Sequence, residues 1–134
     1  MKQAKTLIAL ILISAMAFML WGCKAEEKSD LWADAIHTKD VELGEGAKTV
    51  TVEVKVEEQT VTFTINTDKK TVGEALVENK LIEGDQGAYG IYIKKVNGIT
   101  ADYDTDKAYW AFYVNNQYAS SGVDTTKIEK DATY

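Results

Sequence analysis

A regular alternation of valine with polar residues limits this chain to a fold that contains β-sheet. From Val50 to Val56 every second residue is valine, and the residues between them are threonine, glutamate or lysine. Val61, Phe63 and Ile65 repeat the pattern after a short polar interval. Side chains of a strand point alternately to opposite faces, so this period of two predicts strands with one buried face. We expect two antiparallel strands joined by a turn near residues 57–60.

One helix is predicted after these strands. Thr71 and Glu74 have the spacing of a capping box, in which each side chain satisfies a free backbone donor at the start of a helix. The helix should cover residues 72–80, and residues 84–87 should form a loop. Asn97-Gly98 predicts a tight hairpin, because both residues accept positive φ angles. The order of elements predicts an α+β domain.

The last third of the chain is predicted to add further strands. Residues 109–114 alternate, with Trp110, Phe112 and Val114 on one face and tyrosines on the other. Asn115-Asn116 should turn this strand back, and residues 132–134 resemble the start of a last strand.

The N-terminal residues predict export and lipid attachment. Lys2 and Lys5 precede an apolar run, as in a secretory signal peptide. The end of that run, Leu20-Trp21-Gly22-Cys23, resembles the bacterial lipobox. The resemblance implies that residues 1–22 are removed and that Cys23 carries the lipid, which places the protein outside the cytoplasm on the cell membrane. An uncleaved membrane anchor is the alternative. Residues 23–48 are interpreted as the acylated cysteine and a tether, and residues 49–134 as the domain.

Composition excludes several kinds of function. The chain has 15 basic and 21 acidic residues, and all of the basic ones are lysines, so a nucleic-acid partner is not expected. Its single cysteine cannot form an internal disulfide. The single histidine, His37, falls in the predicted tether, far in sequence from Ser120 and Ser121. We therefore predict that the protein is not an enzyme.

Several segments together resemble one family of bacterial surface modules. They are Thr71–Leu76, Tyr89–Ile93, Val96–Gly98 and Lys107–Asn115. This family is similar to the C-terminal domain of transcobalamin and intrinsic factor, and the match extends over residues 49–134. It implies a β-grasp-like mixed sheet wrapped around one helix, and a corrinoid ligand near the Tyr109 strand. The sequence departs from the family at Tyr134, because the last strand of the family continues several residues further. We therefore expect a short or missing edge strand there, and a sheet edge that could accept a strand from a partner.

Tyrosine-rich strands and one acidic segment are the candidate binding sites. The aromatic face predicts a surface for a small molecule, with a protein or glycan partner as the alternative. Trp110 is also interpreted as a core residue. A divalent metal ion is a further alternative, because Asp102-x-Asp104-x-Asp106 has the opening spacing of a calcium loop, although a solvated acidic turn explains it as well. No cofactor is predicted with certainty. The candidate ligand-binding residues are Tyr109, Trp110, Tyr113, Tyr118, Ser120 and Ser121.

Overall fold

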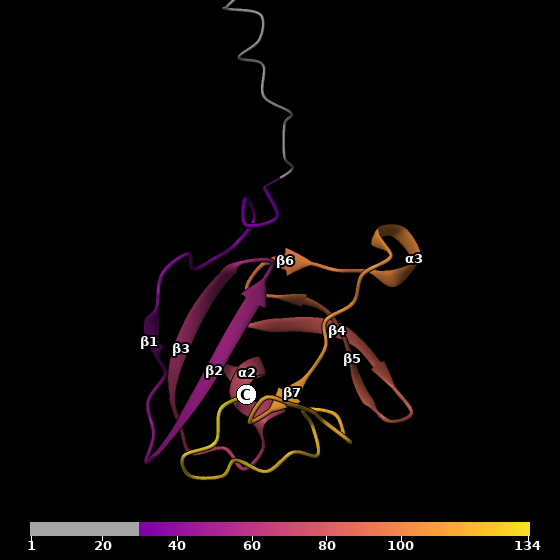
Figure 1. Ribbon diagram of the computed structural model, residues 1–134. Coiled ribbons are helices and arrows are strands. Elements are labelled where there is room, and N and C mark those ends of the chain that lie inside the picture. Colours follow the sequence, from indigo (N-terminus) through magenta and orange to yellow (C-terminus); the bar gives the residue numbers. More distant parts are fainter. Residues whose placement is uncertain (1–29) are drawn as a thin grey trace, which may run out of the picture. The chain divides into compact units, whose positions relative to one another are not determined.

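The computed structural model describes residues 30–134, which hold one compact domain from Leu31 to Tyr134 (Figure 1). The predicted signal peptide and Cys23 lie outside the described residues. Within the described part, no helix is both long enough and apolar enough to cross a membrane.

The domain is a small α+β structure built mainly from strands. Its two three-stranded sheets have the orders β1-β3-β2 and β4-β5-β6, and β7 and β8 form a hairpin. The elements are β1 (Val41–Leu43), β2 (Lys48–Val56), β3 (Gln59–Thr67), α2 (Val72–Glu78), β4 (Ile82–Gly87), β5 (Gly90–Val96), β6 (Ile99–Thr100), α3 (Tyr103–Asp106), β7 (Tyr113–Val114) and β8 (Gln117–Tyr118).

The first sheet confirms the two strands that the alternation predicts. β2 and β3 are antiparallel over their whole length, and Val56 pairs with Gln59 across a two-residue turn. Glu57 has a φ angle of 57° and supplies the positive φ of this turn without a glycine. Val50, Val52 and Val54 are buried, as the period of two requires. β1 adds to the other side of β3 in parallel.

The helix α2 confirms the capping box and is slightly shorter than predicted. The Thr71 side chain accepts a hydrogen bond from the Glu74 backbone N–H at 3.2 Å, and Glu74 accepts from the Thr71 N–H at 3.1 Å. The Glu74 carboxylate also accepts from the Lys70 N–H at 3.0 Å. Backbone donors of Thr71 and Lys70 stabilise the ionised form and lower the pKa of Glu74 below its usual 4.5.

The second sheet confirms one predicted hairpin and corrects one predicted loop. Val96 pairs with Ile99, and Asn97 and Gly98 have φ angles of 51° and 81°, as a type I′ turn requires. A Cβ at position 98 would lie 2.3 Å from the Asp34 carbonyl oxygen, so glycine is needed for space as well. Residues 84–87 are strand rather than loop. These residues are exposed and are held by backbone pairing with β5. They therefore lack the apolar alternation by which a strand can be recognised in the sequence.

The buried core lies between the two three-stranded sheets and α2. Phe63, Ile65, Val72 and Ala75 are fully buried, and Leu81 and Ile82 continue the apolar contact after the helix. At about 25 cal/mol for each Å² of apolar surface removed from water, these side chains supply the main stabilising term of the domain.

The domain begins earlier than predicted, because the compact unit starts at Leu31 and several residues of the expected tether pack on it. Trp32 is buried, and its indole N–H donates to the Val56 carbonyl at 3.3 Å. The Asn97 side chain accepts from the His37 N–H at 2.9 Å and donates to the His37 carbonyl at 2.7 Å. His37 was expected to be solvated, but its ring meets the Phe63 ring edge to face, with ring centres 5.6 Å apart. Tertiary contacts therefore order a segment whose sparse apolar content suggested a linker.

The prediction of one sheet wrapped around one helix is corrected to three separate sheets. Only Tyr113–Val114 of the predicted 109–114 strand is in a ladder, with Asn115 and Asn116 forming the predicted turn at φ angles of 49° and 65°. Residues 108–112 have no regular structure, although the inward and outward alternation of their side chains remains. Residues 108–112 belong to none of the three sheets, and β2 does not pair with them.

Candidate ligand-binding pocket

A pocket of about 920 Å³ opens where the first sheet faces residues 108–113. We call it the β2 pocket, because Val52–Val56 of β2 form one of its walls. The wall opposite is the irregular segment that runs from α3 to β7, and residues of β4, β5 and β6 form the floor. Its apolar lining includes Val52, Val54, Val56, Leu81, Ile93, Ile99, Trp110, Phe112 and Tyr134.

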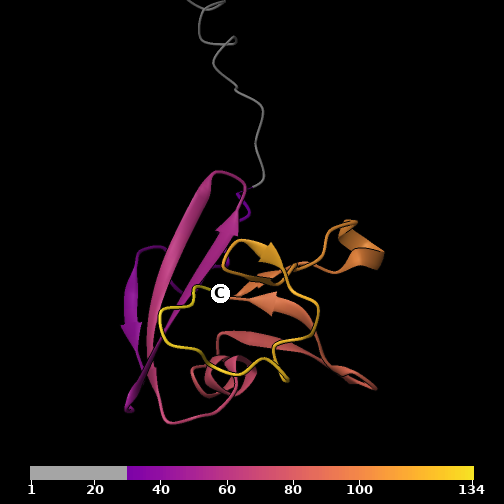
Figure 2. The ribbon, with the colours of Figure 1, turned by 60° about the horizontal axis from the view of Figure 1, so that its bottom comes forward.

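The last two residues of the sequence close one end of the β2 pocket. Thr133 bridges in parallel to Thr51 of β2, while its carbonyl accepts from the Asn115 N–H at 2.8 Å. The Tyr134 ring stacks on Phe112 with ring centres 6.3 Å apart. Figures 1 and 2 both show the C-terminal end between β2 and the β7–β8 hairpin. A strand-like segment thus lies between the two pocket walls at this end.

Trp110 fixes the wall opposite β2. Its indole N–H donates to the Ile99 carbonyl at 3.1 Å, and its half-buried ring packs against the core. The residue therefore combines the two interpretations given to it from the sequence, since it is part of the core packing and also lines the pocket.

The structure divides the predicted ligand-binding residues into two groups. Tyr109, Trp110 and Tyr113 line the β2 pocket. Tyr118, Ser120 and Ser121 line a second, more polar hollow of about 500 Å³. The two groups therefore line separate hollows, and Tyr134 lines both of them.

Three exposed tyrosines lie where the two hollows meet, with Tyr109 and Tyr113 lining the first and Tyr118 lining the second. The rings of Tyr113 and Tyr118 meet edge to face with centres 5.4 Å apart. The nearby Tyr109 raises the pKa of Tyr118 above its usual 10.0, chiefly because a second phenolate charge beside the first is unfavourable. Tyr109, Tyr113 and Tyr118 are each about half exposed or more, so they offer aromatic edges and hydroxyl groups to a ligand.

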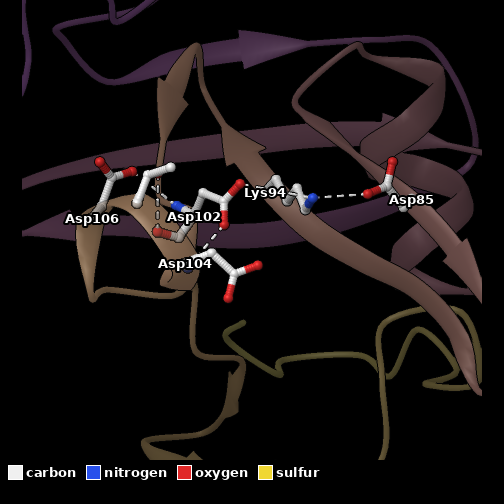
Figure 3. Close-up of polar contacts among 6 residues, drawn as sticks. Asp85, Lys94, Asp102, Asp104 and Asp106 are labelled. Atoms are coloured by element: carbon white, nitrogen blue, oxygen red, sulfur yellow. Dashed lines mark hydrogen bonds and ion pairs between the residues drawn. The ribbon is translucent and has the colours of Figure 1, made fainter.

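The acidic segment 102–106 folds into a short helix, α3, rather than an open loop. Asp102 caps this helix by accepting from the Asp104 N–H at 3.1 Å. Asp106 accepts in turn from the Asp102 N–H at 3.0 Å. Figure 3 shows the Asp104 carboxylate turned away from the other two. Two of the three carboxylates therefore hold the local backbone.

A lysine already occupies the position next to these acids. The Lys94 ammonium lies 2.9 Å from Asp85 and 3.8 Å from Asp102 (Figure 3). The hydrogen bond and charge of Asp85, and then the charge of Asp102, raise the pKa of Lys94 above its usual 10.5. Among residues 30–134, no three acidic, histidine or cysteine side chains are grouped as metal ligands would be. The metal site stays a prediction without a preformed cage.

Sequence reasoning missed two kinds of residue that shape the pocket. Tyr134 forms one end of it, and the only sequence signal was the alternation of Ala132 and Tyr134. Asn97 is fully buried, and its backbone N–H donates to the Leu81 carbonyl at 2.8 Å. Within an Asn-Gly turn, nothing in the sequence separates a buried asparagine from an exposed one.

The fold defines a small α+β domain built mainly from strands, with one mainly apolar pocket beside β2. Residues 69–133 match the family described as a domain of unknown function, DUF4430. A crystal structure of a "putative metal binding protein" from Ruminococcus gnavus is similar, with a TM-score of 0.60 and 30% sequence identity. The alignment covers 65% of this chain and 91% of that one, so the chain belongs to the same family as the R. gnavus protein. No curated protein matches the sequence.

Proposed function

We propose that the domain is a non-enzymatic binding module whose ligand fills the β2 pocket. The observation that carries this proposal is one mainly apolar pocket of about 920 Å³ between two walls that do not pair with each other. Ligand sites are concave and mainly apolar, with volumes of about 300–1,000 Å³. Binding of an apolar ligand in such a pocket is favourable, because it removes apolar surface from contact with water.

The rim of the pocket supports a ligand with a flat face. Tyr109 and Tyr113 line the opening and are exposed, and an aromatic ring packs well on a planar molecule. The resemblance to transcobalamin implies that a corrinoid is one such molecule. A corrinoid near Trp110 should quench the tryptophan fluorescence, and unchanged fluorescence at high micromolar corrinoid would remove this version of the ligand.

Attachment to the cell membrane through Cys23 completes the proposed function. A diacylglyceryl group carries two chains, and two chains hold a protein stably at a bilayer where one does not. The module would then present its pocket outside the cytoplasm. Incorporation of labelled palmitate in growing bacteria tests the anchor, with Cys23→Ser as the variant that should remain unlabelled.

A fluorescent apolar dye such as anilinonaphthalene sulfonate tests the pocket itself. Residues 24–134 contain the whole compact domain and suit this measurement. We expect dye fluorescence to rise on binding, and Val56→Lys to abolish the rise by placing a charge inside the pocket wall. Val77→Lys is the matched control, because Val77 is exposed on α2 and lies outside the pocket lining. Equal dye binding by both variants would refute the proposed site.

Metal binding is a second candidate, favoured by the description of the R. gnavus relative. The predicted ligands are Asp102, Asp104 and Asp106, and an ion there would have to displace Lys94 from Asp102 or bind beside it. A ligand that binds only the folded form raises its stability. A melting temperature that millimolar Ca²⁺ raises in the wild type, but not in Asp104→Asn, would support this function. An unchanged melting temperature would exclude it.

A further inference from the structure

The more polar of the two hollows lies beside the β7–β8 hairpin and is separate from the β2 pocket. We call it the polar hollow. Its volume of about 500 Å³ is within the range of small-molecule sites. Residues 114–121, which include the hairpin, form one wall, and the loop of residues 126–129 forms the other. Two segments that are separate in the sequence therefore enclose this space.

Backbone hydrogen bonds hold both walls of the polar hollow in place. In the hairpin wall, the Ala119 N–H donates to the Phe112 carbonyl at 3.0 Å. In the loop wall, the Thr126 carbonyl accepts from the Val72 N–H at the start of α2, at 2.9 Å. A site whose walls are fixed before binding loses little free energy to ordering when a ligand enters.

The lining of the polar hollow presents neutral hydrogen-bonding groups. Gln117, Ser120 and Ser121 are exposed and contribute one amide and two hydroxyl groups, each able to donate and to accept. Within residues 30–134, no hydrogen bond to another residue engages these three side chains, so they are available to a ligand. Lys127 and Glu129 also line the hollow, and because their charges are opposite, an ion of either sign would be repelled by one of them.

An aromatic ring lies next to these polar groups. The Tyr118 side chain also lines the polar hollow and is 63% exposed. Its ring meets that of Tyr113 edge to face with centres 5.4 Å apart, which limits the positions that it can adopt. The hollow therefore combines one flat apolar surface with several donors and acceptors.

We propose that the polar hollow binds a neutral saccharide, with one sugar ring packed on Tyr118. A sugar ring has an apolar C–H face and a rim of hydroxyl groups that both donate and accept, which matches this combination. An apolar ligand would instead cover the Gln117 amide and the two serine hydroxyls without giving them partners, which is unfavourable. This site does not depend on the ligand of the β2 pocket.

NMR chemical-shift mapping on isotope-labelled residues 24–134 tests the site. The probes are four neutral trisaccharides, namely maltotriose, cellotriose, mannotriose and tri-N-acetylchitotriose, each raised to about 10 mM so that a millimolar Kd is detected. At least one of them should shift the backbone amide signals of residues 117–121 and the side-chain amide signals of Gln117. Absence of shifts with all four overturns the inference.

Variants of the lining separate the proposed contacts from unspecific binding. Tyr118→Ala should weaken binding about tenfold, because it removes the ring surface. Gln117→Met keeps the length of the side chain without its hydrogen bonds, and should weaken binding about threefold. Tyr89→Ala is the matched control, since Tyr89 is 98% exposed and lines neither hollow. If Tyr118→Ala binds as tightly as Tyr89→Ala, the proposed site is wrong.

Two further results would also overturn the inference. Shifts at Val54 and Trp110 in place of residues 117–121 would put the saccharide in the β2 pocket. Tighter binding of sialyllactose, a trisaccharide with one carboxylate, would contradict a preference for neutral ligands. Unchanged amide signals of the buried Phe63 and Ile65 in each free variant separate lost binding from lost folding.

Discussion

The first sheet and the C-terminal segment of this domain are held together in different ways. In β1, β2 and β3, long ladders and a completely buried core fix every strand. In residues 108–134, two-residue strands and isolated bridges alternate with irregular chain. Trp110, Phe112 and Val114 are only partly buried there, against complete burial of Phe63 and Ile65. The contrast places the completely buried core in one region and the wall of the open pocket in the other.

The two regions differ in how much unpaired backbone and accessible apolar surface they leave. A fully paired sheet with its apolar face buried has little left to offer a ligand except at its edge. The C-terminal segment supplies the second wall, and because it does not pair with β2, it leaves apolar side chains and sheet edge accessible. Function is therefore expected where the regular structure of the domain is interrupted.

Truncation of one phenylalanine in each region gives the largest predicted contrast. Phe63→Ala should lower the free energy of unfolding by about 3–5 kcal/mol, because a completely buried ring leaves a cavity. Phe112→Ala should cost only about 1–2 kcal/mol, because its half-buried ring already borders the pocket. Urea unfolding of both variants measures the difference, and equal losses would contradict the division of the molecule.

Removal of the Asn97 side chain should have the next largest effect. Asn97→Ala leaves the His37 N–H and carbonyl without their partner and should cost about 1–3 kcal/mol. Asn116→Ala is the matched control, since Asn116 shares the positive φ angle but is exposed. Thermal or urea unfolding compares the two. If the two variants lose equal stability, backbone strain rather than hydrogen bonding is responsible.

The cap of α2 should give the smallest effect, visible as a pH dependence. The pKa of Glu74 is lowered in the folded state, so its stabilising contribution is present above about pH 4.5 and is lost as the pH falls through the folded value. Glu74→Gln should thus be less stable than the wild type at neutral pH, and the difference should shrink on acidification. Glu58→Gln, in the exposed β2–β3 turn, serves as the control.

A difference between wild type and Glu74→Gln that stays constant from neutral to acidic pH would show that the carboxylate charge does not stabilise the helix start. The size of the loss can be compared with Thr71→Ala, which removes the other half of the capping box and should cost about 1 kcal/mol.

Local patterns predicted the elements whose causes are themselves local. The valine alternation gave β2 and β3, because a strand buried on one face needs that period. Thr71 with Glu74 gave the start of α2, and the two asparagine-containing turns gave their hairpins, since capping and positive φ angles depend on a few neighbouring residues. The alternation of residues 109–114 predicted that Tyr109 and Tyr113 are exposed.

Long-range contacts decided what the sequence could not. Trp32 and His37 belong to the domain only because Val56, Phe63 and Asn97, distant in sequence, provide their partners. β4 is a strand because β5 pairs with it, without an apolar pattern of its own.

The sequence by itself therefore determined an α+β domain with one capped helix and tyrosines on an exposed face. Only the tertiary structure decided that β2 and residues 108–112 stand apart, with Tyr134 closing one end of the space between them. The reason is that a pocket is a property of the distance between surfaces, and that distance is set by packing among residues far apart in the chain.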